Sequence, residues 1–396
     1  MILTQCAVCA TDLGLTLGKK CGRCSTRYCG AECQKQHWEQ GGHDKLCKLI
    51  KKTGGAEQYH ANTKYTEAVR VAAEACADDT KGQTCYICTQ ALHWKTKEGL
   101  VRMCACRGTA GFAHVSCLVE QAKILWEEAE ANNLDVKVQE TRWRRWDTCG
   151  LCNQQYHGGV RCALGWACWK TYLGRPETDE ARGMAMGLLA GGLHEVNHGD
   201  DALSVMEAQL SMERRLGADE DDMLITQGNL ANTYETIGRL EEALSLRQEL
   251  YSGRLKSQGE QHRATLVAAS NYASTLFTLK RFEEAKSLMR KTIPVAQRVV
   301  GESNELTLKM RLVYADALYK DDGATLDDLR EAVTMLKETV QTARRVLGGT
   351  HPLTTEIEGE LRHARAVLVA REAGFDSVRE ALEAMTAGDS YDDAGL

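Results

Sequence analysis

The sequence lacks any long apolar run. No stretch of its 396 residues approaches the roughly 20 consecutive apolar residues that a membrane-spanning helix needs. The first residues, MILTQCAVC, have no basic start followed by an apolar segment, so we expect no signal peptide. With 43% hydrophobic and 26% charged residues, the composition is typical of a globular protein. We therefore expect a protein that has no membrane partner and resides in the cytoplasm or the nucleus.

Cysteine and tryptophan are missing from the second half of the chain. All seventeen cysteines lie between Cys6 and Cys168, and all seven tryptophans precede residue 170. A chain in a reducing compartment rarely uses cysteine for disulfides, so clustered cysteines there indicate metal binding. The sequence thus predicts a metal-binding first part and a remainder of a different kind.

Four closely spaced pairs of candidate metal ligands occupy the first fifty residues. They are Cys6 and Cys9, Cys21 and Cys24, Cys29 and Cys33, and His43 and Cys47. Each short spacing lets one loop or helical turn present two ligands to a tetrahedral zinc ion. Eight ligands make two closed sites, which leave no position for a substrate and serve to stabilise the fold.

This first module resembles a MYND finger. The resemblance lies in the four ligand pairs, in "YC" at residues 28–29, in "CQ" at 33–34 and in "HW" at 37–38. It implies one zinc on Cys6, Cys9, Cys29 and Cys33, and another on Cys21, Cys24, His43 and Cys47. The segment between Trp38 and His43 is slightly longer than usual, so His37 remains an alternative to His43. MYND fingers generally bind partner proteins, often short proline-containing peptides.

A second module follows with eight more candidate ligands. They are Cys85 and Cys88, Cys104 and Cys106, His114 and Cys117, and Cys149 and Cys152. The Cys-x-Cys second pair, the histidine in fifth place and the segments CRGTAGFAHVSCL and CGLCNQQY resemble the RING-CH (RINGv) finger. That resemblance implies a cross-brace, with Cys85, Cys88, His114 and Cys117 on one zinc and Cys104, Cys106, Cys149 and Cys152 on the other.

Two features depart from the usual RING-CH pattern. The gap of 31 residues between Cys117 and Cys149 is long, and we expect an extra helix over 118–133 within it. Familiar RING-CH ligases carry transmembrane helices, and none is expected here. Both departures leave the two predicted metal sites intact.

The RING-CH resemblance implies a ubiquitin-protein ligase. A closed zinc site has no nucleophile, and RING ligases act by holding a charged ubiquitin-conjugating enzyme in a reactive geometry. Ile87, Trp143 and Trp146 are candidate contacts to that enzyme, although packing of the zinc core is an equal alternative for Ile87 and the better one for each tryptophan. The proline common in the last pair of active RINGs is replaced by Gly150 and Leu151.

Three further cysteines, Cys76, Cys162 and Cys168, are left over, and we expect them to be buried packing residues. For Cys162 and Cys168 the alternatives are a covalent ubiquitin acceptor or a further metal pair, but no histidine or acid stands at a spacing that would activate a nucleophile.

The formal charge of the two parts has opposite sign. Residues 1–170 hold 23 Lys and Arg against 17 Asp and Glu (23 − 17 = +6), and the remainder holds 26 against 38 (26 − 38 = −12). Fourteen thiolate ligands and about four zinc ions together add about −6 to the first part, which leaves it near neutral. We therefore expect no direct binding of nucleic acid.

From residue 177 the sequence changes to helical periodicity with an internal repeat. NLANTYETIGRLEEA (229–243) aligns with NYASTLFTLKRFEEA (271–285), and Gly217, Gly259, Gly301 and Gly348 recur at intervals of 42, 42 and 47 residues. Inserted residues at 321–325 account for the longer interval, and 183–203 form a weaker first copy. The segments NLANTY, RLEEA and LGGTHPLT resemble the long tetratricopeptide (TPR) repeats of kinesin light chains. We expect four stacked helix pairs and a helical cap near 375–386.

The resemblance to TPR arrays implies a groove that binds peptides or proteins. Candidate groove residues are Asn229, Asn232, Asn271 and Arg311. The expected fold class is two small zinc-stabilised α+β modules followed by an all-α TPR solenoid. The expected domains are a MYND finger (1–50), a helical linker (51–80), a RING-CH finger (81–157), a connector (158–176), TPR-like repeats (177–386) and an acidic disordered tail (387–396).

These features predict a zinc-binding ubiquitin ligase that recruits a conjugating enzyme through its RING-CH finger and protein partners through its TPR and MYND modules. The alternative is a zinc-stabilised interaction scaffold without ligase activity.

Overall fold

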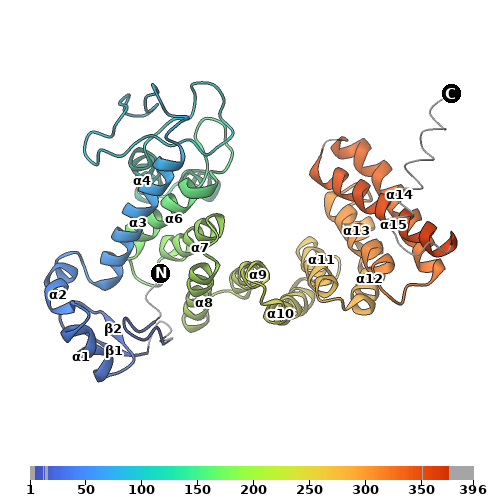
Figure 1. The fold of residues 1–396 in the computed structure, drawn as a ribbon, viewed down its shortest axis with the longest axis horizontal. Coiled ribbons are helices and arrows are strands. Elements are labelled where there is room, and N and C mark those ends of the chain that lie inside the picture. Colours follow the sequence, from blue (N-terminus) through green and yellow to red (C-terminus); the bar gives the residue numbers. More distant parts are fainter. Residues whose placement is uncertain (1–4, 12, 14–16, 350, 374–396) are drawn as a thin grey trace. The chain divides into compact units, whose positions relative to one another are not determined.

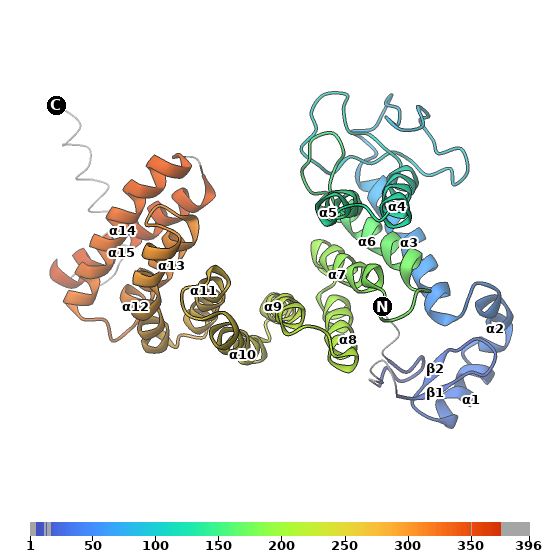
Figure 2. The same ribbon diagram turned by 180° about the vertical axis from the view of Figure 1, so that it is seen from behind.

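The computed structural model describes residues 5–11, 13, 17–349 and 351–373. Contacts divide the chain into two units, Met1–Ile237 and Gly238–Leu396. Regular structure in the described residues is almost entirely helical (Figures 1 and 2). The helical cap expected near 375–386 and the acidic tail expected at 387–396 lie outside the described residues.

The first module has little regular structure. Its elements are β1 (Lys19–Lys20), β2 (Arg27–Tyr28), α1 (Ala31–Glu39) and α2 (His43–Lys52). The two strands are antiparallel, with Lys19 opposite Tyr28. Tyr28 is fully buried, and four of the eight buried residues in its cluster are cysteines. So small an apolar core cannot stabilise a fold alone, which makes metal binding by those cysteines part of the folding free energy.

A long helix, α3 (Ala56–Ala75), connects the first module to the second. The helices of the second module are α4 (Val115–Ala131), α5 (Val136–Trp143) and the 3-10 helix η1 (Arg144–Trp146). The rest of its described residues form loops, linked by two isolated bridges, Val101 with Ala113 and Thr148 with Gln155. Figure 1 shows these loops beyond the ends of α3, α4 and α6 (Gly158–Tyr172).

Helix α4 confirms the extra helix predicted over 118–133, although it begins earlier, directly after His114. Aromatic rings attach this insertion to α6. The ring of Trp143 lies 4.7 Å from that of Trp126 and 5.5 Å from that of Tyr172, measured between centroids. Arg175 also pairs with Glu130 of α4, with nitrogen and oxygen 2.6 Å apart. The insertion is therefore packed against the helical core and is not a free loop.

Residues 158–176, expected to be a connector, contain one of the most buried helices of the protein. Helix α6 is apolar around nearly its whole circumference and packs against both α3 and α7 (Glu180–Glu195). Two glycines allow the close approach of α6 to α7. A Cβ on Gly165 would lie 2.9 Å from the carbonyl oxygen of Leu188, and one on Gly192 would lie 2.8 Å from that of Arg161.

The remaining helices follow the predicted repeat. In the first unit they are α7, α8 (Gly199–Leu216) and α9 (Glu220–Thr236). In the second unit they are α10 (Leu240–Gln258), α11 (Arg263–Thr278), α12 (Phe282–Val299), α13 (Glu305–Tyr319), α14 (Leu326–Leu347) and α15 (Pro352–Ala373). Helices α7 to α14 correspond in order to the four predicted pairs, and α15 follows them. Leucines and alanines of α13, α14 and α15 form the main core of the second unit.

The boundaries of the repeats have a local chemical cause. Four glycines with positive φ follow the second helix of each pair: Gly217, Gly259, Gly301 and Gly348. A polar side chain then caps the next helix by accepting a hydrogen bond from the backbone N–H two residues later: Asp219, His262 and Asn304. Glycine tolerates positive φ and a capping acceptor satisfies a free N–H, so this spacing sets the repeat.

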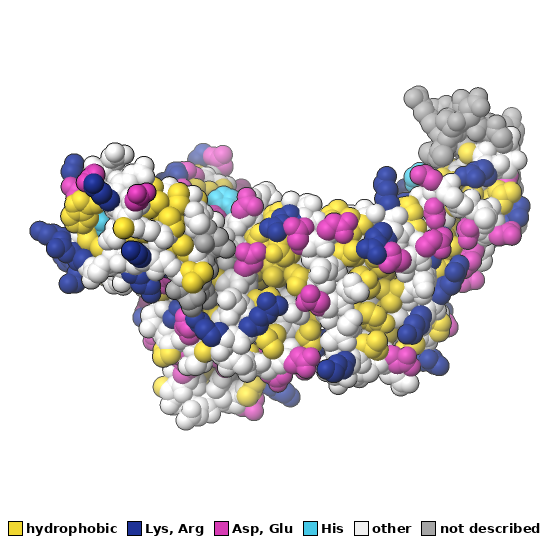
Figure 3. Space-filling model, turned by 90° about the horizontal axis from the view of Figure 1, so that it is seen from below, with side chains coloured by type: hydrophobic (Ala, Val, Ile, Leu, Met, Phe, Trp, Pro, Cys, Tyr) yellow, Lys and Arg dark blue, Asp and Glu magenta, His cyan; other side chains and the backbone are white. Residues whose placement is uncertain are grey.

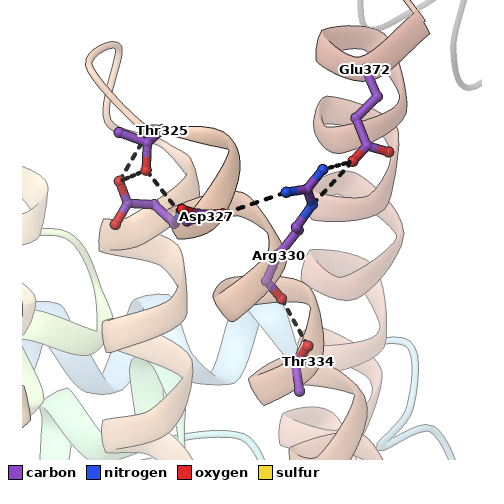
Figure 4. A network of polar contacts seen from close by, with 6 residues as sticks. Thr325, Asp327, Arg330, Thr334 and Glu372 are labelled. Carbon is purple, nitrogen blue, oxygen red and sulfur yellow. Dashed lines mark hydrogen bonds and ion pairs between the residues drawn. The ribbon is translucent and has the colours of Figure 1, made fainter.

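The inserted residues at 321–325 lie, as predicted, between α13 and α14. They end in a capping box. The Thr325 hydroxyl accepts from the N–H of Asp328 at 3.1 Å, and the Asp328 carboxylate accepts from the N–H of Thr325 at 2.9 Å. One turn later, Arg330 pairs with Glu372 of α15 at 2.8 Å (Figure 4).

Candidate metal centres and partner surfaces

The first metal-binding group lies where the N-terminal loop meets the start of α1. It consists of Cys6, Cys9, Cys29 and Cys33, whose sulfur atoms all lie within 4.8 Å of one another. Sγ of Cys9 lies 3.5 Å from that of Cys29 and 3.8 Å from that of Cys33. A tetrahedral zinc with Zn–S bonds of about 2.3 Å places its sulfurs about 3.8 Å apart, so the spacing suits zinc.

The second group is completely buried. It consists of Cys21, Cys24, His43 and Cys47. Nε2 of His43 faces the sulfurs, at 3.4 Å from Sγ of Cys24. His37, the alternative left open by the sequence, instead has its Nδ1 3.0 Å from the Tyr28 hydroxyl and stacks on the His43 ring. The structure thus brings His43, and not His37, to the cysteines.

The third group joins the first loop of the second module to the start of α4. It consists of Cys85, Cys88, His114 and Cys117. Here Nδ1 of His114 faces the sulfurs, at 3.3 Å from Cys88 and 3.7 Å from Cys117. Nε2 of His114 lies 3.4 Å from the carbonyl oxygen of Ala91. A proton on Nε2 donated to that carbonyl leaves Nδ1 available as the metal ligand.

The fourth group consists of Cys104, Cys106, Cys149 and Cys152. Sγ of Cys106 lies 3.8 Å from that of Cys149. Gly111 has a φ of +85°, and a Cβ there would lie 2.6 Å from the Cβ of Cys106, so the segment between the Cys-x-Cys pair and His114 needs glycine at this position. The two groups of the second module interleave along the chain, which is the cross-brace that the resemblance implied.

These four groups have the ligand types and spacing of closed structural zinc sites. The donor sets are cysteine sulfur and imidazole nitrogen, which suit zinc. With four ligands each, they account for about four zinc ions and leave no open coordination position.

The candidate contacts to a conjugating enzyme separate by burial. Ile87 is 36% exposed in the loop between Cys85 and Cys88. Trp146 is only 1% exposed, and its ring packs 5.7 Å from that of Tyr172, so it cannot contact a partner in this conformation. Trp143 is half-buried in the same aromatic cluster. Both tryptophans stabilise the insertion, because their rings fill the space between α4 and α6.

Three exposed apolar side chains were not anticipated as contact residues. Leu92 and Trp94 lie on the loop after the first ligand pair of the second module, and Trp94 is 69% exposed. Leu151 lies between the two cysteines of the last ligand pair. Their sequence signal is an apolar residue in a segment without helical or strand periodicity, as in ALHWKTKEG.

The predicted groove residues also differ in exposure. Asn229 and Asn232 are exposed on α9, and Asn271 is half-buried on α11. Arg311 is mostly buried on α13 and pairs with Glu338 of α14 at 2.7 Å. Arg311 therefore serves packing between two helices and does not fit the predicted groove role.

The three remaining cysteines are buried, in agreement with the predicted packing role. Burial raises the pKa of Cys76, raises that of Cys162 to about 11, and raises that of Cys168 well above its usual range. Cys162 and Cys168 are thus neutral thiols, which are poor nucleophiles and poor metal ligands.

Comparison with protein families agrees with these three regions. The MYND finger family matches residues 6–47, and the RING-variant domain family matches residues 85–134. Two tetratricopeptide repeat families match residues 222–298 and 324–353. The chain contains a MYND finger, a RING-variant finger and tetratricopeptide repeats. The RING-variant match ends before the last ligand pair, yet the structure brings Cys149 and Cys152 to Cys104 and Cys106.

Solved structures of similar arrangement include two repeat proteins. One is a kinesin light chain with nearly identical TPR-like repeats from Podosopora anserina, with 19% identity, a TM-score of 0.42, and coverage of 53% of this chain and 97% of that one. The other is BtubC (BKLC) from P. vanneervenii, with 16% identity, a TM-score of 0.42, and coverage of 69% and 92%. No curated protein sequence matches the chain significantly.

None of the helices in the described residues combines the length and apolar character needed to cross a membrane.

Proposed function

We propose that the protein is a RING-CH-type ubiquitin-protein ligase that acts by positioning and has no catalytic nucleophile of its own. The proposal is supported by the RING-variant match and by the cross-braced arrangement of two closed four-ligand groups. The observation that carries it is the exposure of Ile87, an apolar side chain held at the surface where RING ligases contact the conjugating enzyme.

The zinc-binding loops hold this surface in place. The backbone N–H of Ile87 donates to Sγ of Cys85 at 3.4 Å, and that of Leu151 donates to Sγ of Cys149 at 3.5 Å. Leu151 is 52% exposed and lies with Gly150 inside the last ligand pair, where active RINGs commonly have a proline. Because each backbone is bonded to a zinc-binding sulfur, the apolar side chain it carries is preorganised for a partner.

The other modules would bind proteins in this scheme. The tetratricopeptide repeats would select the substrate, and the MYND finger would bind a second partner. Helix α6 packs against α3 and against α7, the first helix of the repeats. The RING-variant finger and helices α7 to α9 thus belong to one unit, which favours delivery of ubiquitin to a substrate bound at these first repeat helices.

The test is autoubiquitylation of the zinc-loaded chain with a panel of conjugating enzymes. We expect Ile87→Ala to reduce the rate about tenfold, because loss of a central apolar contact costs about 1–2 kcal/mol of binding, which corresponds to about 5- to 30-fold. The matched control is Val136→Ala, which truncates an exposed aliphatic residue on α5 outside the cysteine loops and should leave the rate unchanged. Zinc content should be equal in all three proteins.

The alternative is an interaction scaffold without ligase activity, which the absence of proline between Cys149 and Cys152 favours. A chain that holds four zinc ions and is inert with every conjugating enzyme would support the scaffold and exclude the ligase.

A further inference from the structure

The first unit contains a hollow between α7, α8 and α9, with a volume of about 510 Å³. These helices lie next to one another in Figures 1 and 2. Residues spaced three and four apart on α7 and α9 form its sides, and the C-terminal half of α8 forms its floor. Its size suits one or two side chains of a peptide and exceeds what a single ion needs.

Apolar side chains line part of the hollow and remain accessible. Ile225 on α9 is 57% exposed, Leu216 at the end of α8 is exposed as well, and Met184 on α7 is half-buried. Exposed Ile and Leu side chains that share one concavity gain free energy when a partner covers them, at about 25 cal/mol per Å² of apolar surface. The hollow therefore favours a ligand with an apolar part.

The charged side chains that line the hollow are all acidic. Its described lining contains five acidic residues and no Lys, Arg or His: Glu177, Asp179, Glu180, Glu213 and Asp222. Glu177 and Asp179 already pair with arginines outside the lining. Glu180 and Asp222 form no ion pair with any residue that the structure describes, so their carboxylates are available to a cationic ligand.

The floor presents acceptors that lack a donor. One oxygen of Glu213 accepts from Thr226 at 2.8 Å and from Gln209 at 2.9 Å. The other carboxylate oxygen of Glu213 and the amide oxygen of Gln209 are buried and have no hydrogen-bond partner among the described residues. Burial also raises the pKa of Glu213, which a nearby cation would reverse. Buried acceptors of this kind are normally satisfied, so a ligand that brings N–H groups would complete them.

We propose that this hollow binds a peptide segment in which a Lys or Arg side chain stands next to an apolar side chain. The cation would contact the Glu180 and Asp222 side, and the apolar side chain would cover Ile225. A metal ion fits less well, because the metal-suited groups found in the described residues are all cysteine-based. The proposal rests on the partner-binding role proposed for the repeats and is independent of ubiquitin transfer.

The experiment measures fluorescence anisotropy with the full zinc-loaded chain. The probe is a labelled octapeptide, Gly-Arg-Leu-Lys-Leu-Arg-Leu-Gly. One comparison peptide replaces its basic residues by Glu, and another replaces its leucines by Ser. We expect only the basic, leucine-containing peptide to bind tightly. Its affinity should fall as the salt concentration is raised, because salt screens exposed charge pairs.

Two sets of variants locate the binding site. We expect the double variant Glu180→Gln and Asp222→Asn to weaken binding about tenfold, as two partly exposed ion pairs together contribute about 1.4 kcal/mol. Ile225→Ser should weaken it as well. The matched control is Asp200→Asn with Glu220→Gln, which removes two acids from the first turns of α8 and α9 outside the hollow and should change the affinity less than twofold.

Equal binding of the basic and acidic peptides, equal binding of the serine peptide, or equal weakening by the control pair would overturn the proposal. The peptide-binding experiment and the autoubiquitylation assay test the two proposals separately. A chain that binds the basic peptide at this site but transfers no ubiquitin would contradict the proposed ligase activity and support the binding site.

Discussion

At the residue scale, burial separates side chains of the same type into different roles. Trp146 is enclosed by the aromatic cluster of α4, α5 and α6, whereas Trp94 projects from a loop of the RING-variant finger. Both tryptophans stand in basic segments, RWRRW and HWKTK, and neither segment has a periodicity that predicts which side is buried. The difference depends on the path of the chain far from either residue.

We predict that Trp146→Ala destabilises the protein by about 3–5 kcal/mol, because it leaves a large cavity between the insertion and α6. The matched substitution Trp94→Ala should cost less than about 0.5 kcal/mol, since it removes an exposed side chain. Urea unfolding of the zinc-loaded variants, followed by circular dichroism at constant zinc content, measures both effects. Similar losses for the two variants would show that Trp146 is not a core residue.

At the element scale, local capping chemistry determines where the repeat helices begin. Thr325 and Asp328 satisfy each other's backbone N–H groups at the start of α14. Thr334 lies exposed in the interior of the same helix, and its hydroxyl donates to the carbonyl of Arg330 (Figure 4). The two threonines therefore compare a cap with a mid-helix position in one element.

We predict that Thr325→Ala lowers the free energy of unfolding by about 1 kcal/mol, the usual contribution of an N-cap. Thr334→Ala should be neutral or slightly stabilising, because alanine has the higher helix propensity. Hydrogen exchange of the first turn of α14 gives a local readout of the same change. Unchanged exchange in Thr325→Ala would argue against the capping box.

At the scale of the whole molecule, the two parts of the chain are stabilised by different means. The fingers depend on cysteine and histidine groups around small cores, and the second unit depends on an apolar core that helices α11 to α15 share. On the face shown in Figure 3, Lys and Arg side chains are interspersed with Asp and Glu. Such mixing gives no field of one sign over that face.

We predict that the purified chain contains about four zinc ions and that a strong chelator unfolds the fingers while helices α10 to α15 remain folded. Mass spectrometry of zinc and hydrogen exchange by segment measure both results. Residues 6–47 and 85–152 should lose protection and regain it when zinc is added back. Two or fewer zinc ions per chain would mean that at least one finger is assigned wrongly.

Much of this architecture follows from spacing that can be seen in the sequence. Ligand pairs two to four residues apart, glycines with positive φ and capping residues act over one turn or loop, so their roles can be predicted from neighbouring residues. The sixteen residues gathered into four groups are those expected from the sequence, and the helix order of the repeats agrees as well.

The sequence by itself therefore determined the modules, the ligand types and the repeat period, because each is a local property. Only the tertiary structure decided that His43 rather than His37 meets the cysteines, that Arg311 pairs with Glu338, and that α6 is a core helix. The acidic hollow beside Ile225 is also a feature that only the tertiary structure shows. Each depends on which segments, far apart in the sequence, pack together. The spacing of residues along the chain does not show which of these segments come into contact.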